Sequence, residues 1–202
     1  RQQIEKGEHD NSAVVAKGLR KLYYNTQEKR PFAAIGHLFF HVNEGEIFGL
    51  LGPNGGGKST TMNVITARLR PTKGDAWIMG HSASNDSQSA RHLLGYVPQF
   101  DALFPLLTGR EHLTLFARLK CIPETHIPDY VAYIIKRLGI QHLADKPSST
   151  YSGGNKRKLQ LGLALFGSII LMDEVSSGVD QASQRQLWSL VSTSLTGRAI
   201  KI

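Results

Sequence analysis

A glycine-rich segment that ends in lysine and serine is the part of this sequence best suited to chemistry. Residues 52–59 read G-P-N-G-G-G-K-S and match the pattern G-x-x-x-x-G-K-S/T. Glycines let the backbone curl so that its N–H groups face phosphate oxygens, and the N-terminus of a following helix adds a partial positive charge. Lys58 can reach the β- and γ-phosphates of a nucleotide, and the Ser59 hydroxyl can ligate Mg²⁺. The pattern therefore predicts a phosphate-binding loop, in which Lys58 is also catalytic. The predicted nucleotide-binding residues here are Gly52, Pro53, Asn54, Gly55, Gly56, Gly57, Lys58, Ser59 and Thr60.

An apolar run that ends in two carboxylates is the second candidate. Residues 169–174 read I-I-L-M-D-E. A P-loop protein holds its Mg²⁺ with a carboxylate at the end of a neighbouring strand, which fits Asp173, and Glu174 is placed to orient or deprotonate an attacking water. Read alone, two acids after a strand more often mark a turn or a helix start. With the phosphate-binding loop upstream, they predict Asp173 as a metal ligand and Glu174 as catalytic.

A third candidate is the segment 151–159, which reads Y-S-G-G-N-K-R-K-L. Ser152 and the two glycines after it open a helix, which gives a second helix N-terminus suited to an anion. By itself this is a common capped helix. Its place between the glycine-rich loop and the acidic strand makes it more specific.

Strands and helices must alternate to position these residues. Residues 58–69 have the pattern of a helix stopped by Pro71, and residues 46–51 that of a buried strand bounded by glycines. The alternation predicts an α/β domain with a parallel sheet. The predicted strands are 13–24, 39–42, 46–51, 76–79, 95–97 and 169–172, with a further strand beginning at 198.

The region from about 104 to 150 is predicted to be helical. Thr108 and Glu111 stand at the spacing of a capping box. Apolar residues then recur at helical spacing between Val131 and Leu138, and Gly139 is placed to end that helix. A later helix is expected to place Leu187, Leu190, Val191 and Leu195 on one face, and Gly197 closes it.

Composition limits the class of protein. Of 202 residues, 41% are hydrophobic and 20% charged, which is ordinary for a globular domain. The longest nearly uninterrupted apolar run has 12 residues, whereas a membrane-spanning helix needs roughly 20. Cys121 has no internal partner for a disulfide. The net charge of +8 favours anionic partners, although scattered surface charge explains most of it.

Taken together, these segments resemble the nucleotide-binding domain of ABC transporters over nearly the whole chain from about Ala13. Residues 52–59 resemble the Walker A motif and residues 169–174 the Walker B motif. Residues 95–101, G-Y-V-P-Q-F-D, resemble the Q-loop, and residues 177–180, S-G-V-D, the D-loop. The segments 151–159 and 100–124 resemble the forms found in subfamily A, the lipid-transporter group.

The resemblance implies an architecture. It is that of a P-loop NTPase with a parallel-sheet core, an antiparallel β subdomain and a helical subdomain inserted at about 104–160. Residues 1–11 are expected to be a polar linker and residues 12–202 the ATP-binding domain. Because the chain starts at Arg1 and ends at Ile202, before the family's switch histidine, it is expected to be a piece of a longer protein.

Several residue roles come only from the resemblance. Gln99 is implied to contact Mg²⁺ and the attacking water, and Tyr23 to stack on adenine as the A-loop aromatic, although the adjacent Tyr24 is an open alternative. The family works as a head-to-tail pair of domains. The residues implied to close over ATP held by the other domain are Ser152, Gly153 and Gly154.

The function implied is ATP binding and hydrolysis, with ATP and Mg²⁺ as cofactors, at the cytoplasmic face of a membrane. The implied partners are a second ATP-binding domain and the transmembrane domains of a transporter of substrate, with lipid favoured and no nucleic acid expected. Two alternatives remain: a degenerate ATP-binding domain with a regulatory or structural role, and a soluble ABC-type ATPase of DNA repair or translation. Val175 replaces the usual proline, Gly56 the usual alanine, and the segment 163–168 is about two residues short.

Overall fold

The computed structural model describes residues 12–27, 29–173, 184–185 and 189–190. The chain divides into two compact units, which are taken in turn. The first unit comprises Arg1–Leu94 with Gly197–Ile202, and the second comprises Gly95–Thr196. Glu174, Val175, the segment 177–180 and the strand expected from 198 lie outside the described residues, as do three of the four apolar residues of the late helix, Leu190 being the exception.

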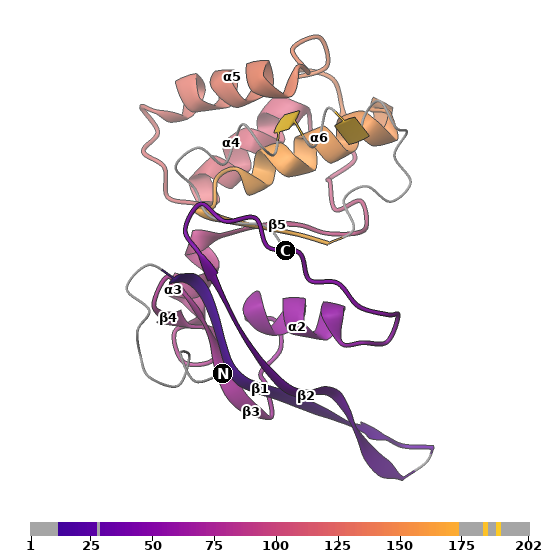
Figure 1. Ribbon diagram of the computed structural model, residues 1–202. Helices are drawn as coiled ribbons and strands as arrows, with labels where there is room; N and C mark the ends of the chain where they lie inside the picture. The colour runs from indigo at the N-terminus through magenta and orange to yellow at the C-terminus, as the bar shows by residue number, and fades with distance from the viewer. Residues whose placement is uncertain (1–11, 28, 174–183, 186–188, 191–202) are drawn as a thin grey trace. The chain divides into compact units, whose positions relative to one another are not determined.

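The first unit is built on an antiparallel sheet of four strands in the order β2-β1-β3-β4 (Figure 1). The long strands β1 (Ser12–Asn25) and β2 (Arg30–Asn43) form a hairpin, and β3 (Lys73–Ile78) and β4 (His81–Ser82) complete the sheet. Apolar side chains from β1, β2 and β3 are buried, which fits the high strand propensity of these segments. The strands predicted at 13–24, 39–42 and 76–79 are therefore confirmed, although β2 begins already at Arg30.

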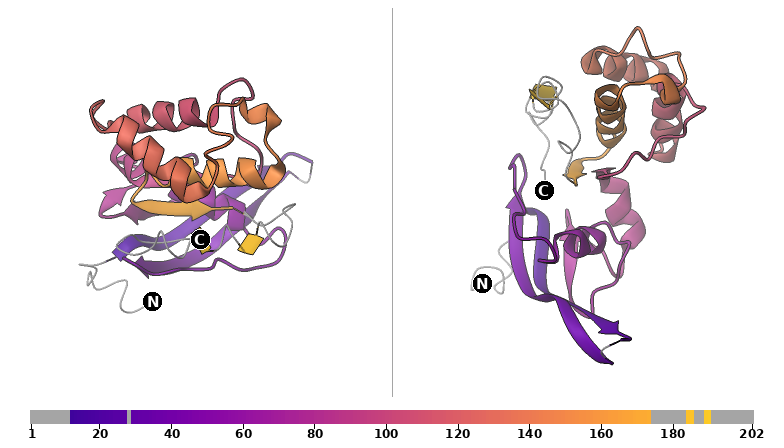
Figure 2. Two further views of the ribbon diagram at one scale, coloured as in Figure 1. Left: turned by 90° about the horizontal axis from the view of Figure 1, so that it is seen from above. Right: turned by 90° about the vertical axis from the view of Figure 1, so that its right-hand side faces the viewer.

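Helix α2 (Lys58–Ile65) lies against β2 and β3 (Figure 2). It buries the side chains of Met62, Val64 and Ile65. It is shorter than the predicted 58–69. The Thr66 hydroxyl donates to the Met62 carbonyl at 2.8 Å, and Ala67 has a φ of 55°, so the helix ends there. A second short helix, α3 (Ser87–Leu93), and strand β4 have no counterpart in the sequence prediction.

The prediction of a buried strand at 46–51 is wrong. In the described part of the chain no strand pairs with this segment, and Leu51 is 93% exposed. A strand is defined by ladder hydrogen bonds to a neighbour, and an apolar sequence alone does not supply that neighbour.

Between Gly95 and Asp173, the continuous described part of the second unit holds three helices and a two-stranded sheet of β5 (Leu94–Val97) and β6 (Ile169–Met172), of which β5 begins at the last residue of the first unit. These helices are α4 (Gly109–Leu119), α5 (Ile127–Leu138) and α6 (Gly153–Ala164), and a 3₁₀ turn, η1 (Ser148–Thr150), precedes α6. The strands predicted at 95–97 and 169–172 are confirmed.

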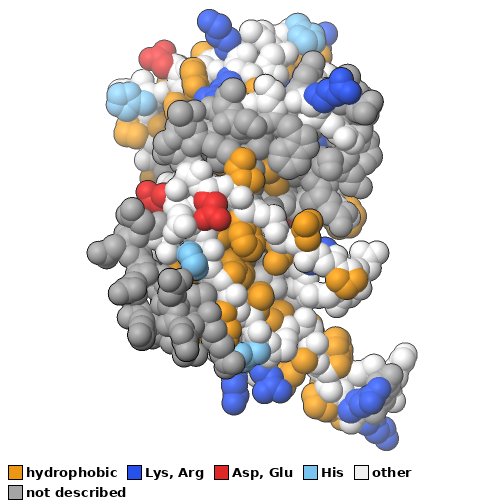
Figure 3. Space-filling view, viewed as in Figure 1, with side chains coloured by type: hydrophobic (Ala, Val, Ile, Leu, Met, Phe, Trp, Pro, Cys, Tyr) orange, Lys and Arg blue, Asp and Glu red, His pale blue; other side chains and the backbone are white. Residues whose placement is uncertain are grey.

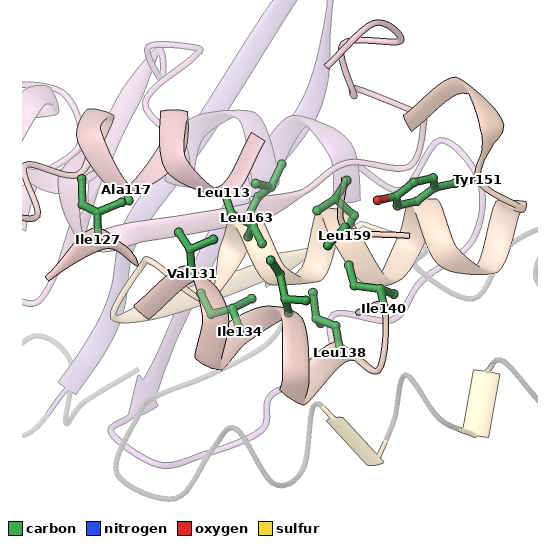
Figure 4. Close-up of a cluster of buried hydrophobic side chains, with 12 residues drawn as sticks. Leu113, Ala117, Ile127, Val131, Ile134, Leu138, Ile140, Tyr151, Leu159 and Leu163 are labelled. Atoms are coloured by element: carbon green, nitrogen blue, oxygen red, sulfur yellow. The ribbon is translucent and has the colours of Figure 1, made fainter. Parts of the chain in front are cut away.

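The three helices share one apolar core, drawn in Figure 4. Leu113 from α4, Ile134 from α5 and Leu159 from α6 are fully buried in it. The capping box of Thr108 and Glu111 is confirmed, and so is the end of α5 at Gly139, which has a left-handed φ of 67°. Among the described helices, none combines the length and the apolar character needed to span a membrane.

Candidate functional site

The glycine-rich loop of the first unit is folded for anion binding. Gly55 and Gly57 have φ values of 79° and 84°, a left-handed conformation that glycine adopts without strain. The Gly56 N–H donates to the Pro53 carbonyl at 3.0 Å, which closes a tight turn. Gly57 then stands at the N-cap of α2 and has no side chain to bond the first N–H groups of the helix. Those N–H groups and the positive end of the helix dipole are thus left for an external anion.

Lys58, the first residue of α2, folds its side chain back over the loop. Its ammonium group donates to the carbonyl oxygens of Gly52 at 2.7 Å and of Pro53 at 3.0 Å. A phosphate oxygen is a stronger partner for an ammonium than a neutral carbonyl, because both members of the bond then carry charge. The loop therefore holds the Lys58 ammonium where it can exchange its carbonyl partners for a phosphate oxygen. Ser59 and Thr60 follow Lys58 in the first turn of α2.

Asp173 and Gln99 follow the two paired strands of the second unit. The Asp173 N–H donates to the Val97 carbonyl at 3.0 Å, so the residue after β6 lies opposite the end of β5, two residues before Gln99. Asp173 and Gln99 offer carboxylate and amide oxygens, the ligand type that Mg²⁺ prefers, and the Ser59 hydroxyl of the first unit is an oxygen donor of the same type. The described residues contain no cluster of three His, Cys, Asp or Glu side chains that could cage a metal. The carboxylate and amide oxygens of the second unit fit Mg²⁺, which uses one or two carboxylates plus substrate phosphates.

Tyr23 lies near the end of β1 in the first unit. Its ring stacks on Phe32 of β2 with 5.7 Å between centroids, and Lys21 Nζ stands 5.4 Å from the ring centroid. Tyr23 is 36% exposed and Tyr24 is 61% exposed. Figure 3 shows hydrophobic and basic side chains together at the far end of this hairpin. Tyr23 thus has a partly exposed ring that packs on a neighbouring strand, whereas Tyr24 has the larger exposed fraction.

Ser152 caps helix α6, as the sequence predicts. Its hydroxyl accepts from the Asn155 N–H at 3.3 Å, and Gly153 and Gly154 form the first turn. The preceding Tyr151 is buried and donates its hydroxyl proton to the Leu143 carbonyl at 2.5 Å. Burial raises the pKa of Tyr151 above its ordinary value. The start of α6 is therefore fixed by a buried anchor and keeps two small residues at its open end.

Sequence reasoning missed three polar residues of the second unit, Lys156, Arg157 and Gln160. All three side chains of α6 contact the segment 98–101, which contains Gln99. The only sequence signal was the i, i+3 spacing of Arg157 and Gln160, which places them on one helix face. The structure thus bonds the Gln99 backbone to α6, and it bonds Asp173 to Val97, two residues before Gln99. The glycine-rich loop and Tyr23 belong to the first unit, and Glu174 lies outside the described residues.

A glycine-rich loop at the start of a helix, an antiparallel β sheet and a helical unit are the features of the ATP-binding cassettes, which have the P-loop fold. The chain belongs to the ABC transporter family, whose model matches residues 35–177. It is 41% identical over 203 residues to ATP-binding cassette sub-family A member 7 of Rattus norvegicus, with 99% of this chain and 9% of the relative covered. It is 43% identical over 195 residues to the phospholipid-transporting ATPase ABCA3 of Homo sapiens, with 95% of this chain and 11% of the relative covered. The chain thus spans about a tenth of the length of these relatives, and the predicted likeness to subfamily A is confirmed.

Solved structures support the same fold. The dimeric post-hydrolysis state of the ATP-binding cassette MJ0796, bound to ADP and Pi, matches with a TM-score of 0.81 and 24% identity over 93% of this chain and 86% of that one. The protein cbiO1 from Clostridium perfringens, part of an ABC transporter complex, matches with a TM-score of 0.80 and 25% identity over 95% of this chain and 78% of that one. The predicted α/β fold class of a P-loop ATPase is thereby confirmed.

Proposed function

We propose that this chain binds and hydrolyses ATP and so powers an ABC transporter of the subfamily A type. The observation that carries the proposal is the glycine-rich loop itself, in which Lys58 Nζ is held by the carbonyl oxygens of Gly52 and Pro53 at the open N-terminus of α2. Loop N–H groups, helix dipole and ammonium all favour the same ligand, a chain of phosphates.

The chemistry proposed is transfer of the γ-phosphoryl group to water. Lys58 stabilises charge on the β- and γ-phosphates, Gln99 and Glu174 orient the attacking water, and Glu174 receives its proton. Ser59, Asp173 and Gln99 would hold Mg²⁺, which when bound neutralises negative charge on the phosphate oxygens. Positioning and electrostatics carry most of the rate in such reactions, so the geometry of these residues decides turnover.

The partners proposed are a second ATP-binding domain and a set of transmembrane domains. The similar cassette MJ0796 is described as a dimer, and the human relative ABCA3 as a phospholipid-transporting ATPase. We propose the same head-to-tail use of the start of α6 here, with Ser152, Gly153 and Gly154 of one domain completing the site of the other. Lipid is the proposed cargo, and the cytoplasmic face of a membrane the proposed location.

Replacement of Lys58 by alanine tests the nucleotide site. Loss of a charge-assisted contact costs about 1.5–3 kcal/mol, so a titration with a fluorescent ATP analogue should show binding at least about tenfold weaker. Lys73→Ala is the matched control, since Lys73 is an exposed lysine of the same unit, on β3, and its loss should leave affinity unchanged. Equal affinity of the two variants would remove the loop from the nucleotide site.

A degenerate domain that binds ATP without hydrolysing it is the second candidate, favoured by Val175 in place of the family's proline. Glu174→Gln separates the two functions in the transporter that contains this chain. A working ATPase should lose about 10²–10⁴ in turnover while it still binds ATP. A degenerate domain would have the same negligible turnover with or without the change.

A further inference from the structure

Arg157 of helix α6 forms hydrogen bonds to the backbone at Gln99. Its guanidinium donates from Nη1 to the Pro98 carbonyl at 2.7 Å and from Nη2 to the Gln99 carbonyl. The same Nη1 also donates to Gln160 Oε1 at 2.9 Å. One side chain therefore bonds two successive peptide carbonyls just after β5, a geometry that suits the planar fork of arginine.

Gln160 extends this contact by one residue. Its side chain is only 3% exposed, its oxygen accepts from Arg157, and its Nε2 donates to the Phe100 carbonyl at 3.1 Å. A buried amide with both ends bonded adopts one orientation, because a flip would place like groups against each other. Gln160 thus holds Arg157 and the Phe100 peptide in a fixed relation.

Lys156 adds a contact between α6 and Asp101, the last residue of the segment 98–101. Its ammonium lies 2.8 Å from Asp101 Oδ2. Burial raises the pKa of Asp101, but the hydrogen bonds from Lys156 and from the Leu103 N–H outweigh it, so the pKa lies below its ordinary value. Each residue from 98 to 101 is consequently bonded to α6.

The far end of α6 is tied to the same strand by backbone packing. A Cβ atom on Gly95 would lie 1.9 Å from the Ala164 carbonyl oxygen, so the main chains of β5 and α6 meet there without an intervening side chain. Helix α6 cannot slide along β5 while this contact and the Arg157 bonds are both present. The backbone of Gln99 is therefore placed by the helix that begins at Ser152.

We propose that Arg157 is a positioning residue for the hydrolysis reaction: it makes the placement of Gln99 depend on helix α6. The proposal rests on the proposed function, in which Gln99 contacts the metal and water and the start of α6 meets the nucleotide of the partner domain. A shift of α6 on contact with that nucleotide is passed to Gln99 through two carbonyl bonds. In this proposal Arg157 acts through the Gln99 backbone and has no direct role in binding the nucleotide.

The test is a double-variant cycle on ATP hydrolysis by the transporter that contains this chain. Arg157→Ala should lower kcat at least tenfold and raise the Mg²⁺ concentration needed for half-maximal rate, while ATP affinity changes less than twofold because the glycine-rich loop is untouched. In a Gln99→Ala background, the same replacement should lower kcat less than twofold, since its effect passes through Gln99. Equal losses in the two backgrounds would overturn the proposal.

Two further variants keep the result decisive. Arg157→Lys retains the charge and one carbonyl bond, so it should restore part of the rate, and it replaces the alanine variant in the cycle if that protein does not fold. Lys136→Ala, an exposed change on α5, is the charge-matched control and should leave kcat unchanged. If Lys58→Ala abolishes turnover but Arg157→Ala does not alter kcat, the inference fails and the ATPase assignment stands. If Lys58→Ala has no effect, the assignment itself fails.

Discussion

Gly57 and Ala34 touch through their backbones: a Cβ atom on Gly57 would lie 2.2 Å from the Ala34 carbonyl oxygen. The backbone of strand β2 thus packs directly against Gly57, the residue before Lys58, and this contact constrains where α2 begins. The left-handed φ of 84° at Gly57 adds a second reason for glycine at this position.

Gly57→Ala should therefore damage both the fold of the first unit and nucleotide binding. Strain at the left-handed position and the backbone shift together should cost at least about 2 kcal/mol, measured as the free energy of unfolding in a denaturant titration. Gly36→Ala is the control, because it lies on the same strand as Ala34 and no described atom lies within 4 Å of its added methyl group. The control should differ from the original protein by less than about 0.5 kcal/mol. Equal stability of the two variants would show that β2 does not constrain the loop.

Tyr23 and Tyr24 can be separated by their effects on ATP affinity. Base stacking on an aromatic ring contributes about 1–3 kcal/mol, so Tyr23→Ala should weaken ATP binding by about 5- to 150-fold. Tyr23→Phe keeps the ring that stacks on Phe32 and should bind nearly as well. Tyr24→Ala should change affinity less than about twofold. The reverse ranking in equilibrium binding would assign adenine to Tyr24.

The capping box at the start of α4 makes stability depend on pH. Glu111 Oε2 accepts from the Thr108 N–H at 2.8 Å, and this bond, followed by that of the Thr108 hydroxyl, lowers the pKa of Glu111 below its ordinary value. The stabilisation from ionised Glu111 is complete above the ordinary pKa of the carboxyl in the unfolded chain and is lost as pH falls through the lower folded-state pKa.

Glu111→Gln isolates this contribution. It keeps a side-chain acceptor at every pH but removes the charge that favours the helix N-terminus. Denaturant titrations should find the original protein more stable than the variant near pH 6, with the difference shrinking towards pH 3. Other acids such as Asp101 titrate in both proteins and cancel in the comparison. A difference that stays constant with pH would contradict the role of the ionised carboxylate.

Gly162 of α6 lies close to side chains of α4 and α5. A methyl group there would lie 2.6 Å from Leu138 Cδ1 and 3.2 Å from Ile134 Cγ2. Alanine gains about 1 kcal/mol of helix propensity, but overpacking costs about 1–3 kcal/mol, so Gly162→Ala should destabilise the second unit.

Leu138→Ala provides the space that the methyl group needs. In that background Gly162→Ala should be less destabilising than in the original protein, because the 2.6 Å contact with Leu138 is gone and only the 3.2 Å contact with Ile134 Cγ2 opposes the gain in helix propensity. The free energies of unfolding of the original protein, the two single variants and the double variant measure the effect of Gly162→Ala in each background. An unchanged loss in the Leu138→Ala background would mean that the clash lies elsewhere.

Local signals in the sequence predicted the local structure well. The capping box of Thr108 and Glu111, the end of α5 at Gly139 and the capped start of α6 at Ser152 each depend on residues within a few positions of one another. The glycine-rich loop is of the same kind. Such features need only short-range hydrogen bonds and allowed φ values, so the residue types determine them.

Features that depend on distant residues were missed. The apolar segment 46–51 lacks a strand partner, and nothing in its own sequence reveals that. The bonds from Arg157 to the Pro98 and Gln99 carbonyls join residues 58 and 59 positions apart, and any surface arginine has the same appearance in the sequence. Residue types therefore supplied candidate residues for the chemistry, but they did not reveal the side chains of α6 that bond to the segment 98–101.

The separation between α6 and the segment it holds also sets an order of events during protein synthesis. Gln160 is made 60 residues after Phe100. At about 5–20 residues per second, the ribosome needs roughly 3–12 s to bridge that interval. During that time the carbonyls of residues 98–100 can bond only to water, because the side chains of α6 that later donate to them have not been made. The glycine-rich loop is already complete by then, so the nascent chain acquires its phosphate-binding residues well before the backbone that places Gln99.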